Sequence, residues 1–424
     1  MHALTRASQP FERSLVTSIA VADYARALDS ITSNWAELSG THGAELREWI
    51  RQIPEELWSE DARVIAALGA SYRSLGREDT SAALPHFELA ELLVSAGVSR
   101  AAELPAIQVQ HSAALRGVGR LEAAEQKARS AWALLQDELH LTLPLRLTLQ
   151  AEASLQRGLV NLHCGQLSEA VTQLHLAAGL SDNGLASTDL AECLGALAFA
   201  AYAVGDFEAA EGHLADAGTV TDNARIHHSR FAAPALITQA LIAADRNDAA
   251  SATTAAATLV DAAGHSDWEP LALYARAVAA AINGKSIEAL DLQRRCIASV
   301  RRWEGSPAVR TFAEMLRAGL HLHLGETSRA AALLSALEPL PDHISCPGSH
   351  RAGILFAAGD FSGCLAALAD CLAIGDQHSE RTLADVLLLT AASNYELGDL
   401  LAADVAFDQA LYLGSQTGIR VPSW

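Results

Sequence analysis

Positive charge and long apolar runs are scarce in this sequence, and each shortage excludes a class of protein. Thirty Lys and Arg residues stand against fifty Asp and Glu, so the formal net charge is −20. An acidic surface repels the phosphate backbone, and we therefore expect no direct nucleic-acid binding by this chain alone. Every stretch of eighteen residues is interrupted by polar side chains, so we expect no membrane span. The N-terminus lacks the apolar core of a signal peptide, and we expect a cytoplasmic protein.

Paired metal-ligating motifs are also missing. The six cysteines are scattered without a CxxC pair, which favours reduced, mostly buried thiols over a disulfide framework or a zinc site; they are Cys164, Cys193, Cys296, Cys346, Cys364 and Cys371. Two histidine pairs, His227/His228 and His321/His323, have spacings that point to different faces of a helix. We therefore expect no metal site, no disulfide and no cofactor.

A fragment that resembles a phosphate loop is incomplete. The segment "INGKS" (282–286) would need a glycine five residues before Gly284, but that position holds Ala279. No strand is expected before it, so the backbone amides could not form a phosphate cradle. We interpret Gly284 as a bend between two helices.

What the chain does contain is a repeat led by glycine. Half of the residues are apolar, chiefly Ala and Leu, which favour helix. Glycines that open "GD", "GR", "GQ" and similar dipeptides follow one another at 34 to 46 residues, with one double interval of 79; they are Gly76, Gly119, Gly165, Gly205, Gly284, Gly325, Gly359 and Gly398. In the double interval, Arg246 or Asn247 replaces the glycine. A period of about 40 residues is typical of an array of helical hairpins.

Each repeat follows the same pattern. A helix ends at the glycine, which adopts the left-handed conformation, and an acidic or small polar residue then favours the start of a second helix. The second helix carries small residues that allow close packing, as in "EAA" at 122–124 and 208–210. We predict an all-α superhelical solenoid of about nine such hairpins over residues 61–414. Residues 1–60 form an N-terminal helical cap and residues 415–424 an exit segment.

Prolines mark the expected starts of several first helices: Pro144, Pro234, Pro270 and Pro307. The unit around "PLPDHISCPGSHRAGILFAAG" has three prolines and the shortest period. We expect a short first helix and an irregularity there.

The hairpins resemble tetratricopeptide repeats lengthened to about 40 residues. The segment "LREWIRQIPEELWSEDARVIAALGASYRSLGR" (46–77) is similar to the entry into the helical-repeat region of MalT-like LuxR-type regulators of the STAND class. The segment "FDQALYLGSQTGIRVPSW" (407–424) is similar to the end of that region. The sequence holds neither the family's GxxxxGK[ST] phosphate loop nor a basic helix-turn-helix block.

The resemblance implies a non-catalytic sensor array that binds a small molecule, peptide or partner protein in a concave groove and passes on a signal. A homo-oligomer is also possible under this reading. Two alternatives remain open: a stand-alone scaffold that binds peptides or proteins without a link to transcription, and an α/α-toroid enzyme, which would need a closed ring and converging carboxylates.

Candidate ligand-binding residues follow from the hairpin register, which directs side chains about three positions before the bend into the groove. We include residues at these positions, residues one position later and Tyr274, which lies ten residues before its bend, because Arg, Tyr and His suit hydrogen bonding, stacking and ion pairing. The candidates are Arg73, Arg116, His163, Tyr202, Tyr274, His323, Tyr395 and Glu396. We expect no catalytic residues.

Overall fold

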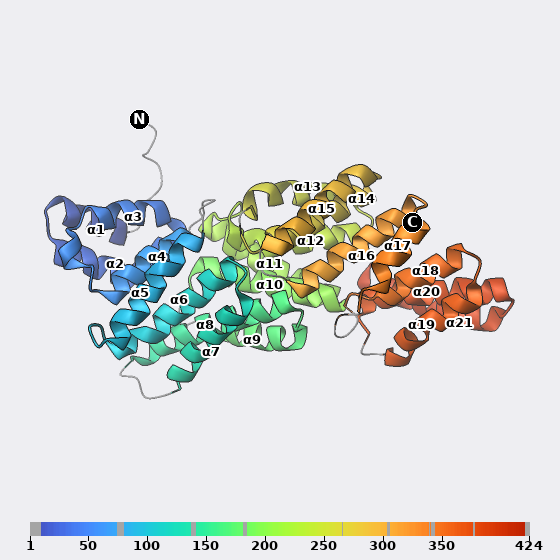
Figure 1. Ribbon diagram of the computed structural model, residues 1–424, viewed down its shortest axis with the longest axis horizontal. Coiled ribbons are helices and arrows are strands. Elements are labelled where there is room, and N and C mark those ends of the chain that lie inside the picture. Colours follow the sequence, from blue (N-terminus) through green and yellow to red (C-terminus); the bar gives the residue numbers. More distant parts are fainter. Residues whose placement is uncertain are drawn as a thin grey trace. The chain divides into compact units, whose positions relative to one another are not determined.

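The computed structural model describes residues 10–73, 80–136, 141–180, 185–264, 266–302, 306–338, 340, 344–375 and 378–419. All regular elements in these ranges are helices, and most of them form antiparallel pairs (Figure 1). The predicted all-α fold is confirmed. No helix in the described part of the chain is both long enough and apolar enough to cross a membrane.

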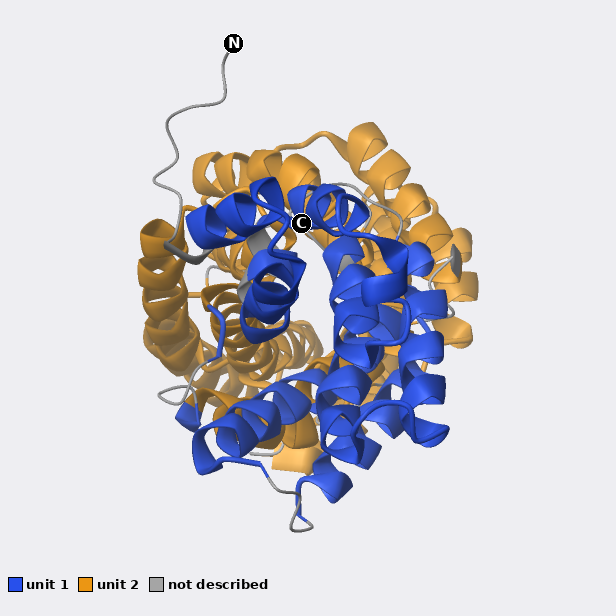
Figure 2. Ribbon diagram, turned by 90° about the vertical axis from the view of Figure 1, so that its left-hand side faces the viewer, with its two compact units in different colours: residues 1–157, 179–186 blue, residues 158–178, 187–424 orange. Residues whose placement is uncertain are grey.

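Two compact units divide the chain, coloured separately in Figure 2. Unit 1 consists of residues 1–157 and 179–186, and unit 2 of residues 158–178 and 187–424. The boundary falls within α8 (Leu143–Cys164), so this helix contributes to both units.

In unit 1, three helices precede the first hairpin: α1 (Pro10–Ala20), α2 (Tyr24–Thr41) and α3 (Gly43–Arg51). Their buried residues share one apolar core with Val64 of α4. The Arg47 side chain donates to the carbonyl oxygen of Ser71 at 2.8 Å, which fixes α3 against the end of the next helix. The unit's hairpins are α4 (Ala62–Ala70) with α5 (Leu84–Ser95), and α6 (Leu104–Gly117) with α7 (Leu121–Leu134).

Unit 2 continues the pattern with seven further pairs, counted over the described residues and including α8. These are α8 with α9 (Leu167–Gly179), α10 (Ser187–Val204) with α11 (Phe207–Ala224), α12 (Ala233–Asp245) with α13 (Ala249–Ala262), α14 (Glu269–Ile282) with α15 (Ser286–Arg302), α16 (Pro307–His323) with α17 (Thr327–Ser335), α18 (Pro347–Ala357) with α19 (Phe361–Ile374), and α20 (Glu380–Leu397) with α21 (Leu400–Thr417). The predicted number of hairpins, nine, therefore holds for the described ranges.

The bends between paired helices use the left-handed backbone that the sequence predicted. Seven of the eight bend glycines have φ between +72° and +101°: Gly119, Gly165, Gly205, Gly284, Gly325, Gly359 and Gly398. Asn247 takes the same conformation at φ +55° and so replaces the glycine of the fifth hairpin. The remaining predicted bend, Gly76, lies outside the described residues.

Aspartates begin many of the second helices. Asp206, Asp248, Asp360 and Asp399 each accept a hydrogen bond from the backbone N–H three residues later, at 2.8 to 3.1 Å. This contact satisfies an amide that the helix itself leaves unpaired. The "GD" dipeptide thus encodes both the end of one helix and the start of the next.

Proline and irregularity also fall where the sequence placed them. Pro144, Pro234, Pro270 and Pro307 occupy the first or second position of α8, α12, α14 and α16. The proline-rich unit has a first helix, α18, of only 11 residues, and the preceding α17 has only 9.

The first helices of unit 2 form an inner layer that closes on itself. Each of α10, α12, α14, α16, α18 and α20 contacts the next in this order, and α20 also contacts α10. The Oγ of Ser379, which precedes α20, donates to the carbonyl oxygen of Ala203 in α10 at 2.9 Å. Side chains on the inner faces of distant repeats are thereby brought together.

Candidate functional site

Six polar side chains from five of these inner helices form an interior cluster, which we call the inner polar cluster. They are Tyr202 of α10, Asp245 of α12, Tyr274 of α14, His350 of α18, and Arg381 and Asp385 of α20. Tyr202 is buried, whereas the other five retain partial exposure. All six belong to unit 2.

Tyr202 and Asp245 are joined by a hydrogen bond within this cluster. The Tyr202 hydroxyl donates to Oδ2 of Asp245 at 2.9 Å. Burial raises the pKa of Asp245, while the charge of Arg381 and the hydrogen bond from Tyr202 oppose that rise. Burial and the nearby Asp245 carboxyl raise the pKa of Tyr202 well above its usual value, so the phenol keeps its proton. Tyr202 therefore acts as a hydrogen-bond donor.

Arg381 is the cation of the cluster. Its guanidinium carbon lies 5.3 Å from the centre of the Tyr202 ring, and its Nη2 donates to the carbonyl oxygen of Ile344 at 2.8 Å. Burial disfavours its charge, but the surrounding phenols and carboxyls outweigh that effect and raise the pKa. Its Nε is buried and makes no hydrogen bond within the described residues.

Asp385 lies one helical turn beyond Arg381 and has a perturbed carboxyl. Burial raises its pKa from 3.8 to about 6; Asp245 adds to this rise and Arg381 opposes it. His350 faces the same interior from α18, and burial and the Arg381 charge lower its pKa, so the imidazole is neutral at pH 7. The cluster thus changes its charge in the mildly acidic range.

Close approach at Gly205 brings Arg381 to the cluster. The glycine has φ +101°, and a Cβ there would lie 2.7 Å from the Cβ of Glu380 and 2.8 Å from the backbone nitrogen of Arg381. The bend after α10 therefore packs directly on the first turn of α20. This contact needs glycine for both its backbone conformation and its lack of a side chain.

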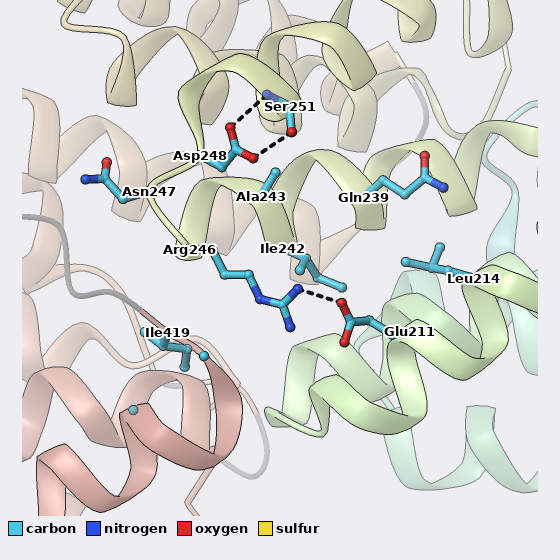
Figure 3. A pocket seen from close by; sticks show the side chains of 12 residues that line it. Glu211, Leu214, Gln239, Ile242, Ala243, Arg246, Asn247, Asp248, Ser251 and Ile419 are labelled. Atoms are coloured by element: carbon cyan, nitrogen blue, oxygen red, sulfur yellow. Dashed lines mark hydrogen bonds and ion pairs between the residues drawn. The ribbon is translucent and has the colours of Figure 1, made fainter.

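An open pocket of about 840 Å³ lies beside this region, between α11, α12, the start of α13 and the end of α21 (Figure 3). Arg246 and Glu211 point toward one another across it, with Nη1 and Oε1 2.5 Å apart. Arg246 also lies 5.9 Å from the Phe207 ring. Because Arg246 already has a carboxylate partner, the pocket offers less unsatisfied charge than the inner polar cluster.

A second buried network in unit 2 is better explained by stability than by binding. Trp268 donates through Nε1 to Glu192 at 2.8 Å, and Arg230 donates to Asp267 at 3.1 Å. His163 joins this network, with Nε2 3.5 Å from Oδ2 of Asp267 and its ring 4.9 Å from that of Trp268. The residues are buried, so the network ties α8 and α10 to the loop before α14.

The eight residues selected from the sequence fall into different environments. Tyr202 and Tyr274 lie together in the inner polar cluster. His163 belongs to the buried network, and Arg116 is fully buried, with Nε 3.3 Å from Oε1 of Gln156. His323, Tyr395 and Glu396 are exposed. Arg73 ends η2 (Ser71–Arg73), and its side chain lies outside the described residues. A binding role for these residues stays a prediction.

The position before the bend does not by itself determine whether a side chain faces a groove. Arg116 is covered by neighbouring helices, whereas Tyr395 sits on the last described hairpin and is 65% exposed. The exposure of such a side chain therefore depends on how the neighbouring hairpins pack against it, and not only on its position before the bend. The sequence register missed Asp245, His350, Arg381 and Asp385, because they do not share one position relative to the bends.

One set of possible metal ligands converges within the described residues. A sulfur or nitrogen donor atom of each of Cys346, Cys371 and His378 lies within 4.8 Å of the others, and all three residues are buried. The three positions are separated by 25 and 7 residues, so no short spacing motif signals them.

Comparison with known proteins identifies fold but not family. No protein-family model matches the chain, and no curated protein matches it. Among solved structures, a Rap protein complexed with competence and sporulation factor has a TM-score of 0.58 and 12% identity, over 86% of this chain and 99% of that chain. At this identity, the likeness shows a shared fold alone.

Two further likenesses are weaker. A tetratricopeptide repeat protein from Parabacteroides merdae has a TM-score of 0.36 and 17% identity, over 68% of this chain and 98% of that chain. The human IFIT1 dimer with PPP-AAAA has a TM-score of 0.42 and 12% identity, over 94% and 89%. Both TM-scores lie below 0.5, so the fold assignment, an all-α array of paired helices, rests on the helices themselves and on the likeness to the Rap protein.

Proposed function

We propose that unit 2 is a non-catalytic binding array, and that its inner polar cluster holds a ligand carrying a carboxylate, such as a short peptide. The observation that carries this proposal is Arg381, a partly accessible cation whose buried Nε makes no hydrogen bond among the described residues. A guanidinium suits a carboxylate because it donates in a planar fork. Tyr202 and Tyr274 supply apolar faces beside it.

The wider surroundings support an ordered ligand site. Tyr202 is buried and the other residues of the cluster are only partly exposed, and charge-assisted hydrogen bonds are stronger in such a setting than in bulk water. The likeness to a Rap protein also supports binding, because that protein of similar fold was solved in complex with competence and sporulation factor. Of the alternatives that the sequence left open, a scaffold that binds peptides or proteins agrees best with these observations.

The finer link to MalT-like LuxR-type regulators stays a prediction, because no comparison bears on it. A reading frame in which this segment is flanked by ATPase and helix-turn-helix segments would support it.

A hydrolytic enzyme is the second candidate, favoured by one observation: Asp385 has a pKa of about 6 and is electrostatically coupled to Asp245. Such a pair can divide acid and base roles. We prefer binding because Asp245 already accepts a hydrogen bond from Tyr202 and feels the charge of Arg381. Turnover of a bound ligand, lost in Asp385→Asn, would reverse this preference.

A peptide screen tests the binding proposal. A library of short synthetic peptides with free C-terminal carboxylates is screened by thermal shift, and the hits are measured by calorimetry. Arg381→Gln should weaken a hit by about tenfold or more, because a hydrogen bond to a charged group contributes about 1.5–3 kcal/mol. The matched control is Arg295→Gln, which changes an exposed arginine on α15 of the same unit. Equal affinity in both variants, with intact helix content, would exclude Arg381 as the anchor.

A further inference from the structure

The end of the array contains a second cluster, which borders the inner polar cluster, because Cys346 interacts electrostatically with His350 and Asp385. Cys346 is the N-cap of α18, Cys371 lies on α19, and His378 precedes α20. The two Sγ atoms are 3.3 Å apart. Sulfurs that bind one tetrahedral zinc ion lie about 3.8 Å apart, since each Zn–S bond is about 2.3 Å. Only a small adjustment separates the observed pair from that geometry.

The histidine is oriented for a ligand role. Its Nδ1 lies 3.1 Å from the carbonyl oxygen of Ser379 and 3.4 Å from Oγ1 of Thr382. A carbonyl oxygen can only accept, so Nδ1 carries the proton and Nε2 carries the lone pair. Histidines that bind metals commonly donate their other nitrogen to a carbonyl in this way, which fixes the tautomer and the orientation of the ring.

The space beside the sulfur atoms is restricted. At Gly348, in the first turn of α18, an added Cβ would lie 2.9 Å from Sγ of Cys371 and 3.3 Å from Sγ of Cys346. The cysteines also belong to an apolar core with Ala352, Leu368 and Val386. Two thiols and an imidazole from three separate segments thus meet in a buried setting.

We propose that Cys346, Cys371 and His378 form a binding site for a thiophilic divalent cation, with Zn²⁺ as the first candidate. Two sulfurs and one imidazole nitrogen are ligands that zinc prefers, and a water molecule or a further donor completes the tetrahedron. The ion would connect α18 and α19 to the residues before α20. Ser379, which follows the histidine ligand, contacts α10, so the ion would stabilise the closure of the inner layer.

Metal titration of the full chain tests this site. The protein is prepared with reductant, freed of metal by chelation and separated from any affinity tag. We expect it to bind about one Zn²⁺ per chain, with a rise of a few degrees in Tm. Co²⁺ in place of Zn²⁺ should give a thiolate-to-metal charge-transfer band, which reports sulfur ligation directly.

Variants assign the ligands. Cys371→Ser and His378→Gln should each lower the affinity for Zn²⁺ at least tenfold and weaken the Co²⁺ band. The matched control is Cys364→Ser, which changes a fully buried cysteine of the same helix and core. It should leave the stoichiometry and the Co²⁺ spectrum unchanged. Circular dichroism of the metal-free proteins checks that each variant folds.

Three results would overturn the proposal. The first is the absence of a thiolate band from wild-type protein with Co²⁺, which needs no variant to fold. The second is Zn²⁺ binding that is unchanged in Cys371→Ser and His378→Gln. The third is a disulfide between Cys346 and Cys371 that persists although the protein is prepared with reductant. Mass spectrometry would show this disulfide as the loss of two hydrogens.

Discussion

At the scale of single residues, the inner polar cluster brings one arginine, Arg381, together with two carboxyl groups, Asp245 and Asp385. Burial acts against the charge of all three groups, and their proximity decides which of them stay ionised. Arg381 remains charged because its surroundings are acidic and phenolic. Asp385 holds its proton to a higher pH than an ordinary aspartate.

This difference predicts a pH-dependent stability. The folded-state pKa of Asp385 is about 6, against an ordinary value of 3.8, so the folded protein binds the proton more tightly than the unfolded chain does. The resulting stabilisation is fully present below pH 3.8 and is lost as the pH rises through 6. We expect the free energy of unfolding in urea to decrease by about 1–2 kcal/mol between pH 5 and pH 7.5 from this group.

The variant Asp385→Asn should reduce that slope and be more stable than wild type at pH 7.5. It should not remove the slope completely, because the pKa of Asp245 is raised as well. Asp404→Asn, which changes an exposed residue of α21, serves as the control and should retain the wild-type slope. A wild-type slope in Asp385→Asn would show that this carboxyl is not the perturbed group.

Sequence reasoning reached part of this cluster. The sequence selects Tyr202 three residues before its bend glycine and Tyr274 ten residues before its own. Arg381 and Asp385 lie in the first two turns of α20, far from that helix's bend, so the register could not select them. The convergence of Cys346, Cys371 and His378 was likewise invisible, because only the packing of three segments brings them together.

At the scale of elements, the bend glycines have one backbone conformation but two kinds of surroundings. Gly205 packs against α20, whereas a Cβ at Gly284, with φ +72°, would meet nothing within 4 Å. Both glycines relieve left-handed strain, but only the first also permits a tertiary contact.

This contrast predicts different costs for the same substitution. Gly284→Ala should lower the free energy of unfolding by about 1–2 kcal/mol, from left-handed strain. Gly205→Ala should lower it by a further 1–3 kcal/mol, because the new methyl group must displace the start of α20. Urea denaturation at one pH compares them directly. Equal costs would mean that the Gly205–α20 contact is not tight in solution.

The aspartate caps give a second prediction at this scale. Asp206 accepts from the N–H of Ala209 at 2.9 Å, and we expect Asp206→Ala to cost about 1 kcal/mol in the free energy of unfolding. Asp206→Asn keeps an acceptor oxygen and should cost only a few tenths of that amount. If both variants lower the free energy of unfolding equally, the negative charge of Asp206 stabilises the helix, and not its hydrogen bond to Ala209.

At the scale of the whole molecule, the repeat pattern predicted the fold class, the hairpin number and most bends. These features depend on local chemistry: helix formers, a left-handed glycine, and an acidic cap at each second helix. The closure of the inner layer depends instead on contacts such as Ser379 to Ala203, 176 positions apart. No local pattern encodes a contact at that separation, so the sequence could not predict it.

The last described hairpin also exposes apolar side chains on one face of α21, notably Leu401, Val405 and Tyr412. We expect a second copy of the chain to cover this face, and therefore concentration-dependent dimerisation in light scattering after size-exclusion chromatography. Leu401→Glu should shift the protein toward monomer, whereas Ile287→Glu, at an exposed apolar residue of α15, should not. A monomer at every concentration would refute this expectation.

Binding within the inner layer of unit 2 is the central claim, and hydrogen–deuterium exchange with and without a peptide hit tests it most directly. We predict that the ligand slows exchange in α10, α12 and α20, the helices that carry Tyr202, Asp245 and Arg381. This protection should be absent in Arg381→Gln and present in Arg295→Gln. Protection confined to unit 1 or to the exposed face of α21, with α10, α12 and α20 unchanged, would contradict the claim.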